Sequence, residues 1–326
     1  MTQPSAPLRV VRAADLEARP DGLRWLVEGL WPDPAVTIVG GQPKSWKSWL
    51  GLDVAVSVAS GTPCLGRFPV HRRGPAVVYL AEDALPDVRA RIECLCRSRG
   101  LALEDQELHV VTEPVLHLDA DEDRRRLRAA VERLGARLLV LDPLVRLHRG
   151  DENSSQEISA LLGFLRELQR AHDVSVLLVH HTSKRTHGRH GQALRGSSDL
   201  HAWADVGLYL TWHGDELRLT PELRVSAAVP PMTLRLVADD PERTHLAVAN
   251  EPGGEPRDGG PTRLPLPQAI LRALERRSPG ACRRGDLREE LRVNNARLGE
   301  ALTELEKLAL VERTDDGWRT AKPRAG

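Results

Sequence analysis

The chain has 326 residues, and its 46 Lys and Arg balance its 46 Asp and Glu, so the formal net charge is zero. Any contact with nucleic acid must therefore come from a local basic patch and not from overall attraction. The length suffices for one sizeable α/β domain and a smaller second one. The four scattered cysteines exclude a disulfide framework, and we expect Cys94 and Cys96 to be buried thiols and not metal ligands. No apolar run reaches the roughly 18 residues of a membrane span and no signal pattern opens the chain, so we expect a soluble cytoplasmic protein.

The first 30 residues form a polar, then amphipathic lead-in, and the sequence Trp31-Pro32-Asp33-Pro34 separates them from the remainder of the chain. Two prolines so close together prevent a helix. We therefore expect the lead-in to pack beside the first strand of a core that runs over residues 31–247.

A phosphate-binding loop is predicted within residues 35–61, which read as a buried strand (36–39), a loop rich in Gly and Lys (40–46) and a helix beginning at Lys47. In that setting backbone N–H groups and the positive end of the helix dipole converge on one point. A Lys there reaches the β- and γ-phosphates of a nucleotide, while a hydroxyl such as that of Ser48 binds Mg²⁺. The residues expected to contact the nucleotide are Gly41, Gln42, Pro43, Lys44, Ser45, Trp46, Lys47, Ser48 and Trp49.

One position departs from the usual pattern of Gly, four residues, Gly, Lys and then Ser or Thr. Gly41, Lys47 and Ser48 match, but Trp46 stands where the second Gly belongs. If that position needs a positive φ, a Trp costs on the order of 1 kcal/mol or more. The alternative is a helix capped by Ser45 beside an ordinary buried Trp.

Acidic residues close two further buried strands. The strand at residues 75–81 ends on Glu82 and Asp83. We expect it next to the first strand, at the sheet edge where ligands bind in open α/β folds, with Glu82 as the base that polarises an attacking water. Asp83 is expected to cap the following helix, residues 84–99, although capping could be the role of either acid. The strand at residues 137–142 ends on Asp142, which is expected to hold the Mg²⁺ shell.

Another buried strand, residues 174–179, ends on His180 and His181. Polar side chains at this point can touch both the γ-phosphate and the loop beyond, so that nucleotide state moves the loop. A paired-histidine metal site is the rival interpretation, although adjacent residues of a strand point to opposite faces.

The loop at residues 184–198 is the candidate for nucleic-acid binding, because it is rich in Gly and basic residues and contains no acid. Its cations are Lys184, Arg185, Arg189 and Arg195. The alternative is a solvated surface loop. Strands at residues 205–211, 216–220 and 232–237 follow, and we expect the later ones to be antiparallel.

Residues 248–263 read as a linker, because Gly and Pro dominate and no apolar periodicity survives. Beyond it, residues 264–326 predict three short helices (267–277, 284–291 and 296–308, the last behind an Asn294-Asn295 cap) and a hairpin, the order of a winged helix-turn-helix domain. Its slight excess of basic residues permits DNA contact, whereas Glu300, Glu304 and Glu306 favour a protein-contact or oligomerisation role.

Five stretches, in order, resemble the RecA-like ATPases related to the plasmid replicative helicase RepA: GGQPKSWKSW, VVYLAED, LLVLDPLVRLH with DEN after it, LLVHHTSK and LRGSSDL. The resemblance implies a RecA-like P-loop α/β core with a mostly parallel sheet. It also implies hexameric rings with ATP between subunits and movement on single-stranded DNA through the central loops. On this resemblance Lys47 and Ser48 serve the phosphates and Mg²⁺, Glu82 is the base, Asp142 is on the Mg²⁺ shell, and His180 or His181 is the γ-phosphate sensor.

The resemblance also implies an arginine finger from a neighbouring subunit. Arg224 lies where family members have Lys-x-Arg, here Glu222-Leu223-Arg224, and Arg195 is the other candidate. The expected function is ATP hydrolysis coupled to DNA in replication or mobile-element maintenance. The alternatives are an ATP-gated DNA-binding regulator with slow hydrolysis, and a non-catalytic assembly module with an altered loop.

Overall fold

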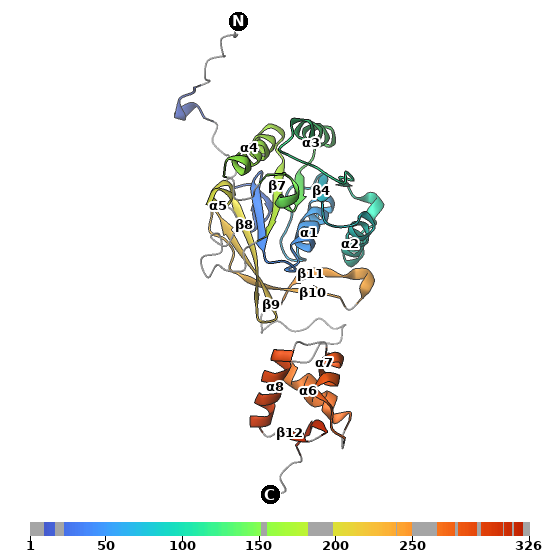
Figure 1. Ribbon diagram of the computed structural model, residues 1–326. Helices are drawn as coiled ribbons and strands as arrows, with labels where there is room; N and C mark the ends of the chain where they lie inside the picture. Colours follow the sequence, from blue (N-terminus) through green and yellow to red (C-terminus); the bar gives the residue numbers. More distant parts are fainter. Residues whose placement is uncertain are drawn as a thin grey trace. The chain divides into compact units, whose positions relative to one another are not determined.

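The computed structural model describes residues 10–16, 23–150, 155–181, 198–238, 240–249, 266–277, 280–291, 295–308, 310–314 and 316–321. The chain divides into two compact units, Met1–Glu255 and Pro256–Gly326 (Figure 1). The expected linker at 248–263 contains this division, but most of it lies outside the described residues.

A nine-stranded sheet organises the first unit, in the order β11-β10-β9-β8-β3-β7-β6-β4-β5. Its strands are β3 (Val36–Gly41), β4 (Ala76–Leu80), β5 (Leu108–Val110), β6 (Leu138–Asp142), β7 (Ser175–His181), β8 (Val206–His213), β9 (Glu216–Leu223), β10 (Met232–Val237) and β11 (His245–Val248). The six strands from β8 to β5 pair in parallel, and β9, β10 and β11 add antiparallel strands beyond β8, as expected for the later strands. β11 was not predicted.

The strand order corrects one expectation. β4, which leads to Glu82, is not beside β3, because β7 and β6 lie between them. The helix that connects β3 to β4 crosses the faces of β7 and β6 on its way. Succession along the chain therefore does not determine adjacency in the sheet, although β4 and β6, the strands of Glu82 and Asp142, are neighbours.

Helices cover both faces of the sheet. They are α1 (Lys47–Ser60) and α2 (Leu85–Ser98) on one face, and α3 (Asp121–Leu134), α4 (Ser155–His172) and α5 (Ser198–Trp203) on the other (Figure 1). Short 3₁₀ turns are η1 (Ala13–Asp15), η2 (Leu103–Asp105), η3 (Leu144–Arg146) and η5 (Pro241–Arg243). Because both faces are covered, most residues of the parallel strands are apolar.

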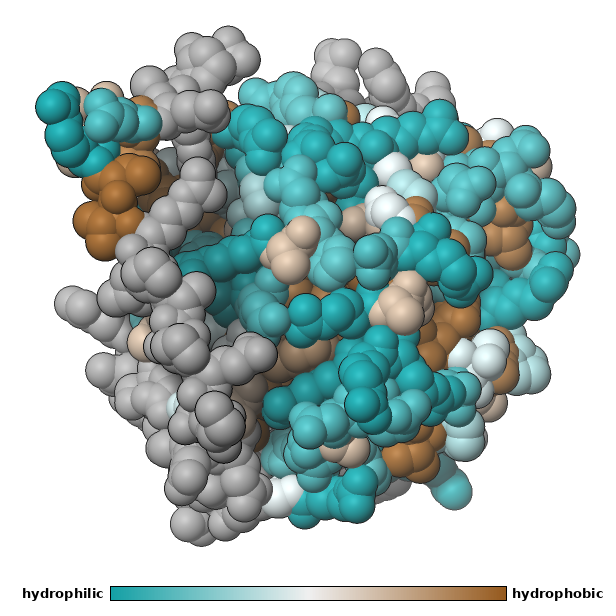
Figure 2. Space-filling model, turned by 90° about the horizontal axis from the view of Figure 1, so that it is seen from above, coloured by the Kyte–Doolittle hydropathy of each residue, from teal (hydrophilic) through white to brown (hydrophobic). Residues whose placement is uncertain are grey.

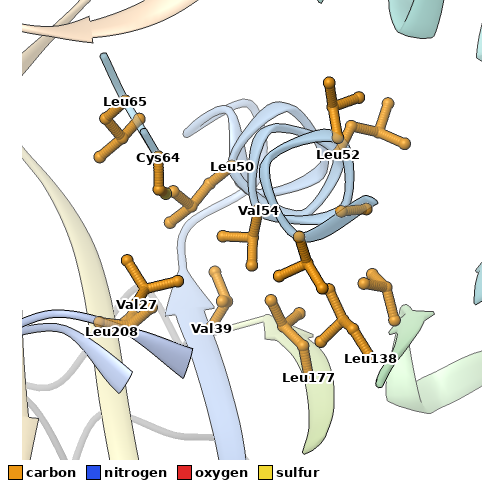
Figure 3. Packing of buried hydrophobic residues seen from close by; sticks show 14 of the residues in the cluster. Val27, Val39, Leu50, Leu52, Val54, Cys64, Leu65, Leu138, Leu177 and Leu208 are labelled. Atoms are coloured by element: carbon orange, nitrogen blue, oxygen red, sulfur yellow. The ribbon is translucent and has the colours of Figure 1, made fainter. Parts of the chain in front are cut away.

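Strand residues alternate between two cores, since successive side chains of a strand point to opposite faces. The first core cluster joins α1 and α2 to one face and includes Val39, Leu50, Val54, Val58, Leu95, Leu177 and Leu208. The second core cluster joins α3, α4 and α5 to the other face and includes Ile38, Leu127, Leu139, Leu165, Leu178 and Tyr209. Figure 3 shows Val39 and Leu177 of the sheet lying opposite Val54 of α1. Leu50, Val54 and Val58 of the helix predicted to begin at Lys47 thus belong to this core.

The ends of two helices follow from local chemistry. Gly61 and Gly135 adopt left-handed conformations directly after α1 and α3, at φ 80° and 57°, which glycine tolerates without steric cost. The expected cap by Asp83 is wrong. The N-cap of α2 is Ala84, which makes no side-chain capping bond, and Asp83 instead accepts two hydrogen bonds from Arg91 at 2.8 and 2.9 Å.

The lead-in contains more structure than expected. β1 (Trp25–Val27) and β2 (Trp31–Pro32) pair antiparallel, and Leu26, Val27 and Trp31 are buried in the first core cluster. Residues of the lead-in therefore contribute to the hydrophobic core of the first unit. Of the two cysteines expected to be buried, Cys96 is buried, but Cys94 is only half-buried and contacts the carbonyl of Pro241.

The second unit has its own core. α6 (Leu266–Glu275), α7 (Arg284–Leu291) and α8 (Asn295–Lys307) precede a hairpin of β12 (Val311–Thr314) and β13 (Gly317–Thr320). Ile270, Leu287, Leu298 and Leu302 are buried among these elements. The order of elements is the predicted one; the name winged helix-turn-helix remains a prediction, and Asn294 lies outside the described residues.

Figure 2 shows one face of the molecule. Where that face is not covered by grey atoms, it is mostly hydrophilic, and its apolar residues occur in small, separate groups. Among the described residues, no helix combines the length and the apolar character needed to cross a membrane.

A buried ion pair fastens α1 to the end of α2. Asp53, in the middle of α1, is 1% exposed, contacts Arg99 at 2.5 Å and accepts the Leu65 N–H at 2.8 Å. Asp53→Ala leaves a largely buried guanidinium without its carboxylate partner and the Leu65 amide without its acceptor, so we expect a loss of about 3 to 5 kcal/mol in the free energy of unfolding. Urea unfolding measures it. The matched control is Glu122→Gln, which breaks the exposed pair with Arg125 and should change stability by about 0.5 kcal/mol or less. An equal effect of the two variants would contradict the role of the buried pair.

Candidate active site

The phosphate-binding loop lies at the C-terminal edge of the parallel sheet, between β3 and α1. Gly41 ends β3, and a Cβ built on it would lie 2.5 Å from Ser45 Oγ and 2.9 Å from the Leu210 carbonyl oxygen. Only glycine fits there without displacing backbone. The Gln42 carbonyl then accepts from the Ser45 N–H at 3.3 Å, the Ser45 hydroxyl at 2.7 Å and the Lys47 ammonium at 2.8 Å. Three donors of the loop thus bind one acceptor, the Gln42 carbonyl oxygen, and these hydrogen bonds hold the loop together.

Trp46 has the left-handed conformation that the second glycine of the usual pattern would supply, with φ 59° and ψ 27°. Lys44 is also left-handed, with φ 65°. Each such residue other than glycine costs roughly 1–2 kcal/mol. The loop thus keeps the shape expected of a phosphate-binding loop without the second glycine. The alternative of a Ser45 cap is wrong, because Trp46 is the N-cap residue and the Ser45 hydroxyl bonds to Gln42.

An aromatic contact accompanies the strained backbone. The rings of Trp46 and Trp212 lie edge to face, with centroids 5.0 Å apart and planes at 74°. A pair in this arrangement contributes about 0.5–1.5 kcal/mol beyond its burial, the same order as the strain. Sequence reasoning missed Trp212, which follows the predicted strand at 205–211 but carries no local signal of a contact with a residue so distant in the chain.

Lys47, the first residue of α1, is 5% exposed. Burial lowers the pKa of its ammonium group to about 8, against the opposing influence of the negative charges on Asp142 and Glu82. The loop thus places a poorly hydrated cation at the N-terminus of a helix, where phosphate oxygens are favoured binding partners.

Asp142 ends β6 and is 7% exposed. Burial raises its pKa to about 6, although the Ser48 hydroxyl donates a hydrogen bond to it and Lys47 lies near. Its Oδ2 atom is buried and has no hydrogen-bond partner. A buried carboxylate oxygen without a partner, next to a hydroxyl, is a donor set that suits Mg²⁺. The residues present therefore fit the ion that the loop pattern implies.

Glu82 lies beyond the end of β4, and its charge acts on both Lys47 and Asp142. The predicted acids of neighbouring strands thus come together. One Glu82 oxygen accepts a hydrogen bond from Arg146 at 2.9 Å, and the side chain is 44% exposed. Arg146 belongs to η3, which follows β6, and no sequence pattern indicated this ion pair.

Two further predicted positions border the loop. His180 and His181 belong to β7, opposite Gly40 and Gly41 of β3, so both are strand residues at the edge where the loop begins. His180 is buried and His181 half-buried. Trp49 packs against the first core cluster, and the Arg91 guanidinium lies 5.9 Å from its ring centre. Arg91 also holds Asp83, so it links the two helices that flank the site.

The predicted finger Arg224 does not join this group. Arg224 follows β9 beside Val206, at the opposite end of β8 from Leu210, which pairs with Gly41. It contacts Asp205 at 3.5 Å and the Ala202 carbonyl. The other predicted positions, Lys184, Arg185, Arg189 and Arg195, lie outside the described residues.

The raised pKa of Asp142 has a consequence for stability. A folded-state pKa of about 6, above the ordinary 3.8, means that the folded protein binds this proton more tightly than the unfolded chain. The resulting stabilisation is complete below pH ~4 and is lost as the pH rises through ~6. Since Asn cannot ionise, we expect Asp142→Asn to be more stable than the unaltered chain at pH 7 by about 2 to 3 kcal/mol, with the difference vanishing near pH 4. Urea unfolding at the two pH values checks it.

The control for that measurement is Asp121→Asn, because the Asp121 side chain is 90% exposed. Its stability should match the unaltered chain at both pH values. An Asp142→Asn variant that is no more stable than the unaltered chain at pH 7 would contradict the assignment of Asp142 as a strained, buried charge.

The fold resembles known ATPase structures. The ATPase domain of G40P superposes with a TM-score of 0.50 at 14% identity, covering 66% of this chain and 85% of that one. The RadB recombinase gives a TM-score of 0.48 at 19% identity and covers 67% and 92%. A DnaB-like replicative helicase, in a structure that concerns its interactions with primase, gives 0.49 at 15% and covers 63% and 55%.

The sequence matches a family model over residues 2–187, a range that includes the phosphate-binding loop, Glu82, Asp142 and both histidines. That model, AAA_25, is described as an AAA domain. The chain therefore belongs to the AAA domain family AAA_25, and its fold is the RecA-like α/β fold that the five sequence stretches predict.

Proposed function

We propose that this protein is an ATP hydrolase that assembles into a homo-oligomeric ring, a hexamer, and acts on single-stranded DNA in replication or mobile-element maintenance. The observation that carries the proposal is the pair of buried charges Lys47 and Asp142 beside a loop in phosphate-binding shape. Each charge is poorly hydrated, and the Oδ2 atom of Asp142 lacks a partner. A magnesium nucleotide would bring phosphate oxygens to Lys47 and a cation to the unpartnered oxygen of Asp142.

Each residue then has a distinct role. Lys47 and the loop amides hold the phosphates, and Ser48 and Asp142 hold Mg²⁺, which neutralises charge that develops on the phosphates. Glu82 accepts the proton of the water that attacks the γ-phosphorus. His180 and His181 are neighbours of the loop on β7 and sense the γ-phosphate.

The DNA contacts and the domain roles rest on the sequence. Lys184, Arg185 and Arg189 contact the phosphates of single-stranded DNA through the central loops. Residues 31–247 are the ATPase core, 248–263 the linker and 264–326 a winged helix-turn-helix domain that binds DNA or a protein. A protein that acts on DNA in this way works in the cytoplasm.

The Arg146 ion pair favours a second candidate, an ATP-gated DNA-binding regulator with slow hydrolysis. In this structure the Arg146 guanidinium contacts Glu82 at 2.9 Å, and so competes with an attacking water for the carboxylate. Turnover without an activator would then be slow. The third alternative, a non-catalytic module with an altered loop, is disfavoured by the left-handed conformation of Trp46.

The base assignment predicts that Glu82→Gln binds ATP with unchanged affinity but loses at least about 100-fold in turnover, the contribution expected of a general base. Steady-state ATP hydrolysis and binding of a fluorescent ATP analogue measure the two quantities. Glu93→Gln, which alters a half-buried acid of α2 paired with Arg89, is the control and should retain full turnover.

The same assay with and without single-stranded DNA separates the candidates. Stimulation of ATP hydrolysis by DNA supports the first candidate, the ATP hydrolase that acts on single-stranded DNA. Slow hydrolysis that DNA does not stimulate supports the regulator. Normal turnover in Glu82→Gln would contradict the assigned base, while failure of the unaltered chain to bind ATP would leave only the assembly module.

The trans arginine predicts complementation between variants. Arg224→Ala should lose turnover, because the guanidinium no longer stabilises charge in the neighbouring site; such a finger contributes roughly 10³–10⁵ to turnover. Mixing it with Glu82→Gln creates interfaces with an intact Glu82 from one subunit and an intact Arg224 from the other. We expect activity to reappear on mixing. No recovery would contradict Arg224 as the finger, and the experiment is then repeated with Arg195→Ala.

A further inference from the structure

We propose that Trp212 is a positioning residue, which holds Trp46, and through it the phosphate-binding loop, in the nucleotide-binding shape before nucleotide arrives. The inference rests on the proposed function and concerns the same loop. Its starting point is the left-handed backbone of Trp46, at φ 59°, where most side chains would favour a right-handed conformation. Because Lys44 is left-handed too, the loop contains two such residues within three positions.

A strained loop persists only where its surroundings hold it. The neighbour that supports Trp46 is Trp212. The centroids of the two rings lie 5.0 Å apart, and their planes make an angle of 74°. Both side chains are half-buried and pack against the first core cluster. The indole of Trp46 is therefore fixed on one side by the core and on another by a ring from β8.

β8 is a suitable support, because it is paired on both sides. It runs parallel to β3 and antiparallel to β9, and Trp212 itself pairs with Leu217 of β9. Leu210, two residues earlier and so on the same face, lies against Gly41: a Cβ on Gly41 would be 2.9 Å from the Leu210 carbonyl oxygen and 3.2 Å from its Cβ. β8 thus contacts both ends of the loop, Gly41 and Trp46.

Such an anchor performs the function of the missing glycine in a different way. A glycine makes the left-handed conformation accessible, whereas the Trp46–Trp212 contact makes it the preferred conformation of the empty loop. A loop that is already ordered loses less conformational entropy when nucleotide binds. Loss of the anchor should therefore weaken nucleotide binding without removing any group that contacts the phosphates.

The test compares Trp212→Ala with Trp212→Phe in the full chain. We expect Trp212→Ala to raise the Kd for a fluorescent ATP analogue with Mg²⁺, and the KM for ATP, by about tenfold. KM should rise more than kcat falls, and Trp212→Phe, which keeps an edge-to-face partner, should restore most of the affinity. The matched control is Trp203→Ala, which removes a half-buried indole from the second core cluster on the other face of the sheet.

A second measurement does not depend on nucleotide. Amide hydrogen exchange of residues 42–47 in the nucleotide-free protein should be faster in Trp212→Ala than in the unaltered chain or in Trp203→Ala. Equal exchange and a Kd within about twofold of the unaltered chain, a negligible change in binding free energy, would overturn the anchor. If the unaltered chain binds no ATP, the proposed function fails, whereas the exchange rates still decide whether Trp212 orders the loop.

Discussion

The candidate site is built around one energetically unfavourable arrangement, the burial of Lys47 and Asp142 at the C-terminal edge of a parallel sheet. Desolvation lowers the pKa of the amine to about 8 and raises that of the acid to about 6, so the two values approach each other. Their mutual attraction does not cancel the cost of removing them from water. Under the proposed function, a ligand that brings phosphate oxygens and a divalent cation would offset this cost.

Several buried and half-buried acids outside the candidate site are paired with arginines, and two of them lie at the opposite edge of the sheet. Asp33 is buried and contacts Arg72, and Asp205 contacts Arg166 at 2.5 Å and accepts the Val36 N–H at 3.1 Å. Between the two edges lies Asp53, paired with Arg99. These acids have arginine partners, whereas Asp142 keeps a buried oxygen without one. This contrast supports the proposal that Asp142 binds a ligand, whereas the paired acids stabilise the fold.

Contacts from several elements hold the phosphate-binding loop and its surroundings in place. α1 is buried along most of its length, so that the helix dipole and its first amides are held rigidly against the sheet. Arg91 connects α2 to both Asp83 and Trp49, and β8 lies against Gly41 and Trp46. The site residues are thus positioned by elements that come from distant parts of the chain.

Local patterns were enough to predict the elements that carry the chemistry. The apolar strands ending on Glu82 and Asp142 and the helix beginning at Lys47 all depend on residues close in sequence, so they could be recognised without coordinates. The antiparallel character of the late strands was also predictable. Short-range interactions decide these features, and short-range information is what a sequence displays directly.

Only the tertiary structure decided which elements meet. The sequence did not reveal that β7 and β6 separate β3 from β4, that Asp83 binds Arg91 instead of capping α2, or that Arg146 contacts Glu82. In the sequence, Trp46 is only a departure from the loop pattern. Its contact with Trp212 is not visible there, because the two residues are far apart along the chain. The sequence by itself determined the components of the site, through spacing and hydrophobic pattern. Their partners were decided by packing, since contacts between distant residues depend on the order of strands in the sheet, which no local pattern encodes.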